Sequence, residues 1–323
     1  MADHASAESE APALISCQPP SRPALRSRLP PPVTLAVCLT YIGVFVLAHA
    51  LPEGAILRWL SPDSFRVWER TPLSLYTLVS SNLVHLEAWH LALNLLALLF
   101  LGRHIEPAIG SRRFTWLLLG AGLAASGLQL AMFGDLGIGG SGVAYGLFGF
   151  GAVAQRSFPE LRRVLTLQTS AVWVGWFLAC WLAPALHVAN GAHLGGLLFG
   201  LASGASAEWS SHPRLRRMVQ VGVPTLAVLA GTFPIWQAGW WAAIGVRAHR
   251  ARNYELAIDA YRESLQKDPA QTWVRGNVVR AEASSGHPEQ ARAALEELQR
   301  RAPAKAQALL EELKRTGRAP WAP

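Results

Sequence analysis

The sequence predicts an all-α protein, a polytopic bundle of membrane-spanning helices followed by a small C-terminal domain of solenoid-like helical repeats. The first observation is composition: 51% of the 323 residues are hydrophobic and only 15% are charged, whereas soluble domains are about one quarter charged. The second is that long uncharged runs alternate with short arginine-rich segments, which is typical of membrane spans and their loops. The third is a period of 34 residues that begins after Gln237, where charged residues become frequent.

The charge balance also bears on partners and cofactors. A net charge of +8 and a pI near 10 could indicate nucleic acid binding, but the arginines cluster between apolar runs, as cytoplasmic loops require. We therefore expect a lipid bilayer and no nucleic acid as partner. Cys17, Cys38 and Cys180 show no disulfide or metal-ligand spacing, so no metal or cofactor is expected.

The N-terminal part divides into three segments. Residues 1–32 are basic and rich in proline, alanine and serine, which predicts a disordered cytoplasmic tail. The uncharged run Val33–Leu51 is long enough to be the first span. Pro52–Trp89 mixes charges with aromatic residues, which favours an interfacial domain in the headgroup region.

Five further apolar runs complete a predicted six-span core over residues 33–207: His90–Ile109, Phe114–Phe133, Ser141–Ala154, Val164–Leu186 and Gly191–Ala207. Arginines occur in the loops at 102–113, 155–163 and 208–217, whereas the loops at 134–140 and 187–190 have no Lys or Arg. This alternation places the N-terminus inside and the Ser141 end of the fourth span outside. Because that run has only about 14 residues, Ser141 should lie below the membrane surface and be reached through a cavity.

Residues 208–236 form an arginine-rich loop and an expected seventh span, Met218–Trp236. An uncharged run of this length predicts a crossing, which would place the C-terminal domain outside the cytoplasm. The arginines on its two sides nearly balance, and Pro224 and Pro234 leave a kinked or re-entrant path open.

Residues 237–323 carry the repeat. Ala257 recurs as Ala291, Tyr261 as Leu295, and Pro269 as Pro303, and the first copy begins with Trp241, Ile244 and Gly245. This pattern resembles the tetratricopeptide repeat, a helix pair closed by a proline. Leu309, Leu310 and Leu313 indicate a capping helix. Two repeats and a cap are marginal alone, so we expect them to pack on the membrane domain and to serve a protein partner.

The glycine-flanked serine in Gly139-Gly140-Ser141-Gly142 has two interpretations. Serine often caps a helix N-terminus, and Val143 rules out the G-x-S-x-G elbow of soluble hydrolases. Alternatively Ser141 is a nucleophile, because glycines let a substrate approach and free N–H groups at a helix start can bind an oxyanion.

Polar residues inside the other apolar runs are also candidates, because such residues are costly in lipid. His193 shares one helix face with Gly196 and Gly200 and could be the general base for Ser141 or an incidental residue of a glycine packing face. His90 and Asn94, with His85 upstream, are spaced to donate hydrogen bonds to one point, as in an oxyanion hole, or to join helices.

Taken together, these motifs resemble the rhomboid intramembrane serine proteases over about residues 33–207. The resemblance implies a Ser141–His193 dyad without an acidic third member. It also implies an oxyanion hole formed by His90, Asn94 and the Ser141 N–H. The remaining implied site and structural residues are Tyr145 beneath the imidazole, Gly140 and His85 as support, Glu106 bracing the second span, and Gly196 and Gly200 packing on the fourth span. One position departs from the family, because Tyr76-Thr77 stand where a Trp-Arg pair is frequent.

The implied function is an intramembrane serine endopeptidase that cleaves transmembrane proteins through an acyl-enzyme, with the bacterial inner membrane as the expected location. The alternative is an inactive rhomboid-like protein that binds membrane clients and uses its repeats as an adaptor. Such relatives lose the serine or the histidine, and this chain keeps both. A transporter is disfavoured because the spans have few acidic relay residues.

Overall fold

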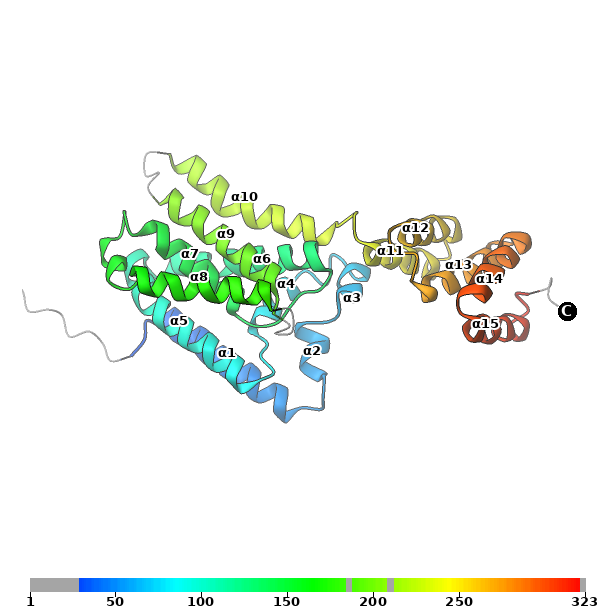
Figure 1. Ribbon diagram of the computed structural model, residues 1–323, viewed down its shortest axis with the longest axis horizontal. Coiled ribbons are helices and arrows are strands. Elements are labelled where there is room, and N and C mark those ends of the chain that lie inside the picture. The colour runs from blue at the N-terminus through cyan, green and yellow to red at the C-terminus, as the bar shows by residue number, and fades with distance from the viewer. Residues whose placement is uncertain (1–28, 184–187, 208–211, 320–323) are drawn as a thin grey trace, which may run out of the picture.

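The computed structural model describes residues 29–183, 188–207 and 212–319. Within these ranges every secondary-structure element is a helix (Figure 1). The α-helices are α1 (Pro32–Ala50), α2 (Ala55–Leu60), α3 (Ser64–Glu69), α4 (Thr77–Ser80), α5 (Ala88–Ile109), α6 (Ser111–Phe133), α7 (Ser141–Ala154), α8 (Leu167–Leu182), α9 (Asn190–Ser206), α10 (Pro213–Thr232), α11 (Ala238–Arg250), α12 (Tyr254–Lys267), α13 (Thr272–Ser285), α14 (Pro288–Arg301) and α15 (Pro303–Arg315). The tail expected at 1–32 lies almost entirely outside the described residues, as do parts of the loops expected at 187–190 and 208–217.

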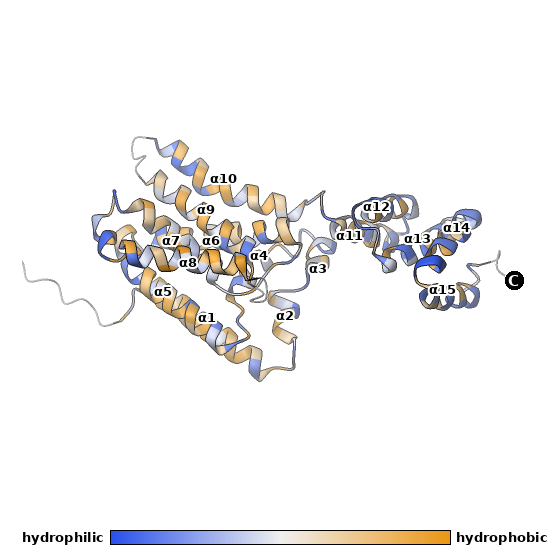
Figure 2. Ribbon diagram, in the orientation of Figure 1, coloured by the Kyte–Doolittle hydropathy of each residue, from blue (hydrophilic) through white to orange (hydrophobic). Residues whose placement is uncertain are grey.

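The all-α membrane bundle with a C-terminal helical domain is confirmed. Among the described residues, α1, α5 and α6 are long and apolar enough to cross a bilayer, and α7 and α8 are shorter apolar helices. Figure 2 shows the contrast between the apolar bundle and the polar repeats, which extend from one end of it. The chain is therefore a multi-pass integral membrane protein.

The centre of the bundle is α7, whose ends coincide with the run expected at 141–154. It packs on α9 with almost no side chain between the two backbones. A Cβ at Gly196 would collide with the Gly142 carbonyl oxygen, and one at Gly200 with the Gly146 carbonyl oxygen. Small residues at such crossings let membrane helices approach closely. This contact sets the distance between Ser141 on α7 and His193 on α9.

Glu106, near the end of α5, fastens the start of α1. Its carboxylate accepts hydrogen bonds from the Val33 and Thr34 N–H groups at 3.0 and 2.8 Å, from the Thr34 hydroxyl at 2.7 Å and from the Ser111 hydroxyl at 2.7 Å. A carboxylate satisfies the free N–H groups of a helix start and is favoured by the helix dipole. Glu106 therefore joins α1 to the α5–α6 turn, the expected bracing position.

The helix α10 has different bounds from the apolar run in which we expect the seventh span. We expected Met218–Trp236, whereas α10 begins at Pro213 and ends at Thr232. Proline at the first position starts the helix early and brings arginines into its first turns. Pro234 ends it early, because a residue before proline disfavours the helical conformation. The helix nevertheless lies along α6, where Gly127 contacts Ala227 and Gly231.

The repeat region forms two helix pairs, α11–α12 and α13–α14, followed by α15. Ala257 and Tyr261 are buried in the core of the first pair, at 0% and 1% exposure. Leu309 and Leu313 of α15 pack on α13 and α14, so the expected capping helix is present. Arg280 donates two hydrogen bonds to Glu312, at 3.1 and 2.8 Å, which lowers the pKa of that carboxyl group and ties α13 to α15.

Candidate active site

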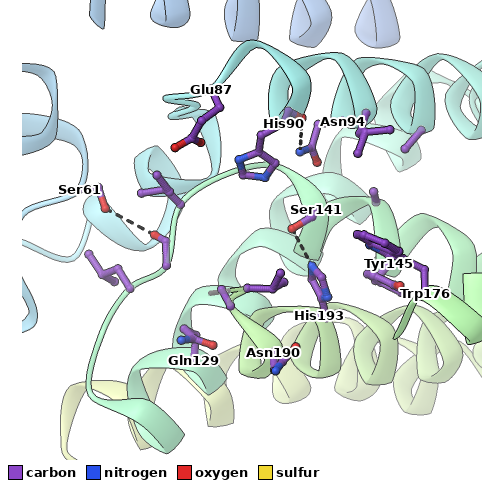
Figure 3. Close-up of a pocket in the computed structure, with 18 of the residues that line it drawn as sticks. Ser61, Glu87, His90, Asn94, Gln129, Ser141, Tyr145, Trp176, Asn190 and His193 are labelled. Carbon is purple, nitrogen blue, oxygen red and sulfur yellow. Dashed lines mark hydrogen bonds between the residues drawn. The ribbon is translucent and has the colours of Figure 1, made fainter. Parts of the chain in front are cut away.

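Ser141 and His193 point at one another across the α7–α9 contact (Figure 3). The Ser141 Oγ lies 2.8 Å from the His193 Nε2. Ser141 is the first residue of α7, and the N-cap position before it is occupied by Gly140. Nε2 can accept the serine proton only in the tautomer that carries the ring proton on Nδ1, and Nδ1 is buried without a hydrogen-bond partner among the described residues. This geometry suits a hydroxyl activated by a neutral imidazole.

Tyr145 supports the histidine ring. It lies one helical turn after Ser141, and its ring packs on the His193 imidazole with centroids 4.6 Å apart and planes inclined by 40°. The Tyr145 hydroxyl donates to the Trp173 carbonyl oxygen at 3.1 Å, which anchors the tyrosine to α8. Both contacts restrict rotation of the imidazole, so the dyad geometry is held by three helices.

His90 and Asn94 lie one turn apart on α5 and line the same cavity as Ser141. The Asn94 amide donates to the His90 carbonyl oxygen at 2.9 Å. The His90 ring rests on Gly139, where φ is +100° and a Cβ would come within 2.5 Å of the ring. Glycine is therefore required at this position, both for its backbone conformation and for the approach of the imidazole.

His85 has a different place from His90. Its side chain is fully buried and does not line the cavity. The Gly140 N–H donates to the His85 Nε2 at 3.2 Å, and the ring packs between Tyr41 and His90 at centroid distances of 4.8 and 5.1 Å. His85 thus orients the backbone immediately before Ser141 rather than facing a substrate.

The cavity has a volume of about 1350 Å³ and extends from Ser141 toward the gap between α5 and α8. Its rim includes Leu96 on α5 and Val172 and Trp176 on α8, which are 66%, 71% and 46% exposed. Apolar rim residues that face outward within a membrane bundle are in contact with lipid. Exposed apolar side chains of both α5 and α8 therefore line the cavity that contains Ser141.

Sequence reasoning missed two polar residues at this site. Gln129 on α6 accepts from the Ala192 N–H at 3.1 Å and donates to Asp135 at 2.6 Å. Asn190, one turn before His193, donates to the Cys180 carbonyl oxygen at 3.1 Å and joins α9 to α8. Both hold the segment that carries His193. An amide inside an apolar run was the available signal for Gln129.

Comparison with known families and proteins finds matches to both parts of the chain. Residues 72–208 match the rhomboid domain, and residues 248–313 match a tetratricopeptide repeat. Proteins named Rhomboid protease GlpG are similar: that of Yersinia enterocolitica is 29% identical over 53% of this chain and 60% of its own length. That of Klebsiella pneumoniae is 32% identical over 53% of this chain and 61% of its own length. That of Serratia proteamaculans is 31% identical over 57% of this chain and 64% of its own length.

The matches thus span about three fifths of the length of these relatives. Both resemblances noted in the sequence are confirmed. The chain carries a rhomboid domain over residues 72–208, followed by a tetratricopeptide-repeat segment over residues 248–313.

Proposed function

We propose that the chain is an intramembrane serine endopeptidase of the bacterial inner membrane. The observation that carries the proposal is the 2.8 Å contact between the Ser141 Oγ and the His193 Nε2 inside a cavity of a rhomboid domain. The relatives are named proteases, which supports the same reaction class. The direct test is cleavage of a transmembrane protein reconstituted with the chain in liposomes, with a fluorophosphonate probe reporting on Ser141.

The proposed reaction begins when the Ser141 oxygen attacks a scissile carbonyl carbon while the His193 Nε2 takes the serine proton. The tetrahedral intermediate then collapses, and the protonated imidazole gives that proton to the leaving amine, which departs with the C-terminal fragment. A water molecule, deprotonated by His193, then attacks the carbonyl carbon of the resulting serine ester. As the ester C–O bond breaks and the N-terminal fragment leaves as a carboxylic acid, the imidazolium returns its proton to the Ser141 oxygen. The two-residue dyad accounts for every proton transfer.

The carbonyl oxygen becomes negatively charged in the intermediate and needs hydrogen-bond donors. We assign this role to His90, Asn94 and the Ser141 N–H, which surround one side of the cavity. The Ser141 N–H belongs to the first turn of α7, so it has no partner within the helix, and the helix dipole favours an anion there. These donors form an oxyanion hole on the α5 side of the dyad.

The substrate class follows from the depth and the opening of the cavity. With 14 residues at 1.5 Å each, α7 is about 21 Å long, so Ser141 lies below the surface of a core of about 30 Å. The opening between α5 and α8 leads to lipid. A transmembrane helix entering there must unwind to expose a carbonyl, so small or helix-breaking residues near the cut are expected.

Removal of an oxyanion donor provides one prediction. His90→Ala or Asn94→Ala is expected to lower kcat by about 10- to 1000-fold, with a smaller change in KM, because the lost hydrogen bond acts in the transition state. The measurement is steady-state cleavage of a reconstituted transmembrane substrate, normalised to the fraction of active enzyme.

Asn82→Ala is a matched control for Asn94→Ala. Asn82 is a buried amide that donates to Ser126 at 2.9 Å and does not line the cavity. This control should lower thermal stability and leave kcat close to that of the parent chain. Unchanged kcat in both cavity variants would mean that His90 and Asn94 only join helices.

Membrane topology provides a second prediction. We propose that α10 is a seventh crossing, because it runs from an arginine-rich start to the end of α6, where the Trp236 indole N–H donates to the Ala131 carbonyl oxygen at 2.8 Å. A reporter active only outside the cytoplasm should therefore be active when fused after Pro323 and inactive when fused after Ala207. Inactivity at both positions would mean that α10 does not cross the membrane and that the repeats lie in the cytoplasm.

A further inference from the structure

The repeats pack on α3, a short helix in the segment between α1 and α5. Phe65 on α3 meets Trp273 on α13 edge to face, with ring centroids 5.6 Å apart and planes at 82°, and it also joins the apolar core of the repeats beside Val246 of α11. At the other end of α3, Glu69 forms an ion pair with Arg250 of α11, and the Glu69 side chain is only 10% exposed. The first helix of each repeat thus contacts α3.

The membrane bundle covers the opposite side of α3. Val67 and Trp68 are 0% and 4% exposed and share a cluster with Leu130 of α6 and Ala243 of α11. The Trp68 indole N–H donates to the Gly231 carbonyl oxygen of α10 at 2.9 Å. Helix α3 is therefore enclosed between the bundle and the repeats.

The segment that links the bundle to the repeats is short and is held in place by hydrogen bonds. Only residues 233–237 separate α10 from α11. The Gln237 amide donates to the Ala131 carbonyl oxygen at 3.1 Å, and the Trp240 indole donates to the Thr232 carbonyl oxygen at 3.0 Å. The repeats are thus fixed against the end of the bundle where α2 and α3 lie, as Figure 1 shows.

The residues just before α3 belong to the cavity wall. Ser61, Pro62 and Asp63 line the cavity, and Asp63 caps α3 by accepting from the Arg66 N–H at 3.0 Å. The Ser61 hydroxyl lies 3.5 Å from the carbonyl oxygen of Gly137, in the loop that leads to Ser141 (Figure 3). A displacement of α3 would therefore move the wall that adjoins the nucleophile loop.

We propose that the repeat segment is a clamp for the chain's own first loop. The face formed by α11 and α13 binds α3 as an internal ligand, much as solenoid repeats present extended surfaces to partners. The bound helix holds the Ser61–Asp63 wall of the cavity in place. Any protein that takes this face must displace α3, so binding at the repeats and the shape of the cavity are coupled. Only the effect of the wall on cleavage rests on the proposed protease function.

The docking of α3 can be tested without catalysis, in the full chain carrying Ser141→Ala. Trp273→Ala removes the aromatic partner of Phe65 and should raise the rate of trypsin cleavage after Arg66 and Arg70 by about tenfold, because a buried aromatic contact of this kind is lost. Leu256→Ala is the matched control, since Leu256 is similarly exposed on α12 and belongs to neither cluster that contains α3 residues. Equal cleavage in the Trp273→Ala and parent chains would overturn the clamp.

Reversing the charges of the Glu69–Arg250 ion pair provides an independent test of the clamp. Arg250→Glu should also increase cleavage after Arg66, and adding Glu69→Arg should restore the parent rate, because the swapped pair can form again. In chains that keep Ser141, Arg250→Glu should lower cleavage of a transmembrane substrate several-fold, and the double variant should restore it. If the double variant is still cleaved by trypsin faster than the parent chain, the clamp is overturned. If Arg250→Glu exposes α3 to trypsin but leaves cleavage of the transmembrane substrate unchanged, the effect of α3 on the cavity wall is overturned. Fluorophosphonate labelling of the parent chain tests the proposed protease function separately.

Discussion

Replacing Ser141 with alanine is expected to lower cleavage of a reconstituted transmembrane substrate by at least about 10⁴-fold, because no other group can form the acyl-enzyme. His193→Ala should have a similar effect, since the serine would lose its base at 2.8 Å. The two residues act as one unit, so the double variant should be no slower than either single variant. A fluorophosphonate probe should label the parent chain and leave Ser141→Ala unlabelled.

Ser203→Ala provides the matched control for the serine. Ser203 is a buried residue of α9, 3% exposed, whose hydroxyl has no hydrogen-bond partner among the described residues and does not line the cavity. Its removal should leave both folding and turnover close to the parent values. Substantial turnover by Ser141→Ala would exclude the proposed nucleophile. Stable binding of transmembrane clients by a parent chain that neither cleaves them nor reacts with the probe would support the adaptor alternative.

Much of the fold could be predicted because lipid imposes a simple rule on sequence. A crossing segment must be largely apolar, so the last residues of α5, α6 and α7 coincide with the ends of the apolar runs, whereas α5 and α6 begin two and three residues earlier than their runs. The ends of α10 did not follow, because proline and arginine determine them rather than hydropathy. The docking of α3 could not be predicted at all, since its contacts join residues as much as about two hundred positions apart, such as Phe65 and Trp273.

The site residues also divide into those that could be identified from the sequence and those whose place only the fold explains. Ser141 and His193 could be identified as candidates because each is a polar residue in an apolar run beside glycines. The N-cap of α7 is Gly140, and the Ser141 hydroxyl lies 2.8 Å from the His193 ring, which supports the proposal that Ser141 is a nucleophile. His85 and His90 look alike in sequence, and only the fold gives His85 a backbone contact and His90 a place in the cavity.

Gly196→Ala is expected to reduce both stability and activity, although it adds a single methyl group. A Cβ at Gly196 would collide with the carbonyl oxygen of Gly142, which is backbone and cannot rotate away. Helices α7 and α9 must therefore separate, which costs about 1–3 kcal/mol, as overpacking does elsewhere. The same separation lengthens the Ser141–His193 contact, and a displacement of about 1 Å in a catalytic pair can lower the rate about 100-fold. Thermal unfolding in detergent and kcat measure the two effects.

Gly175→Ala on α8 is the control that separates packing from helix propensity. A Cβ at Gly175 would meet no atom within 4 Å, so the substitution introduces no collision. Alanine is a better helix former than glycine by about 1 kcal/mol, which should make this variant neutral or slightly more stable, with kcat unchanged. If Gly196→Ala behaved like Gly175→Ala, the α7–α9 glycine contact would not be what sets the dyad distance. A loss confined to Gly196→Ala would tie the close approach of these helices to the chemistry at Ser141.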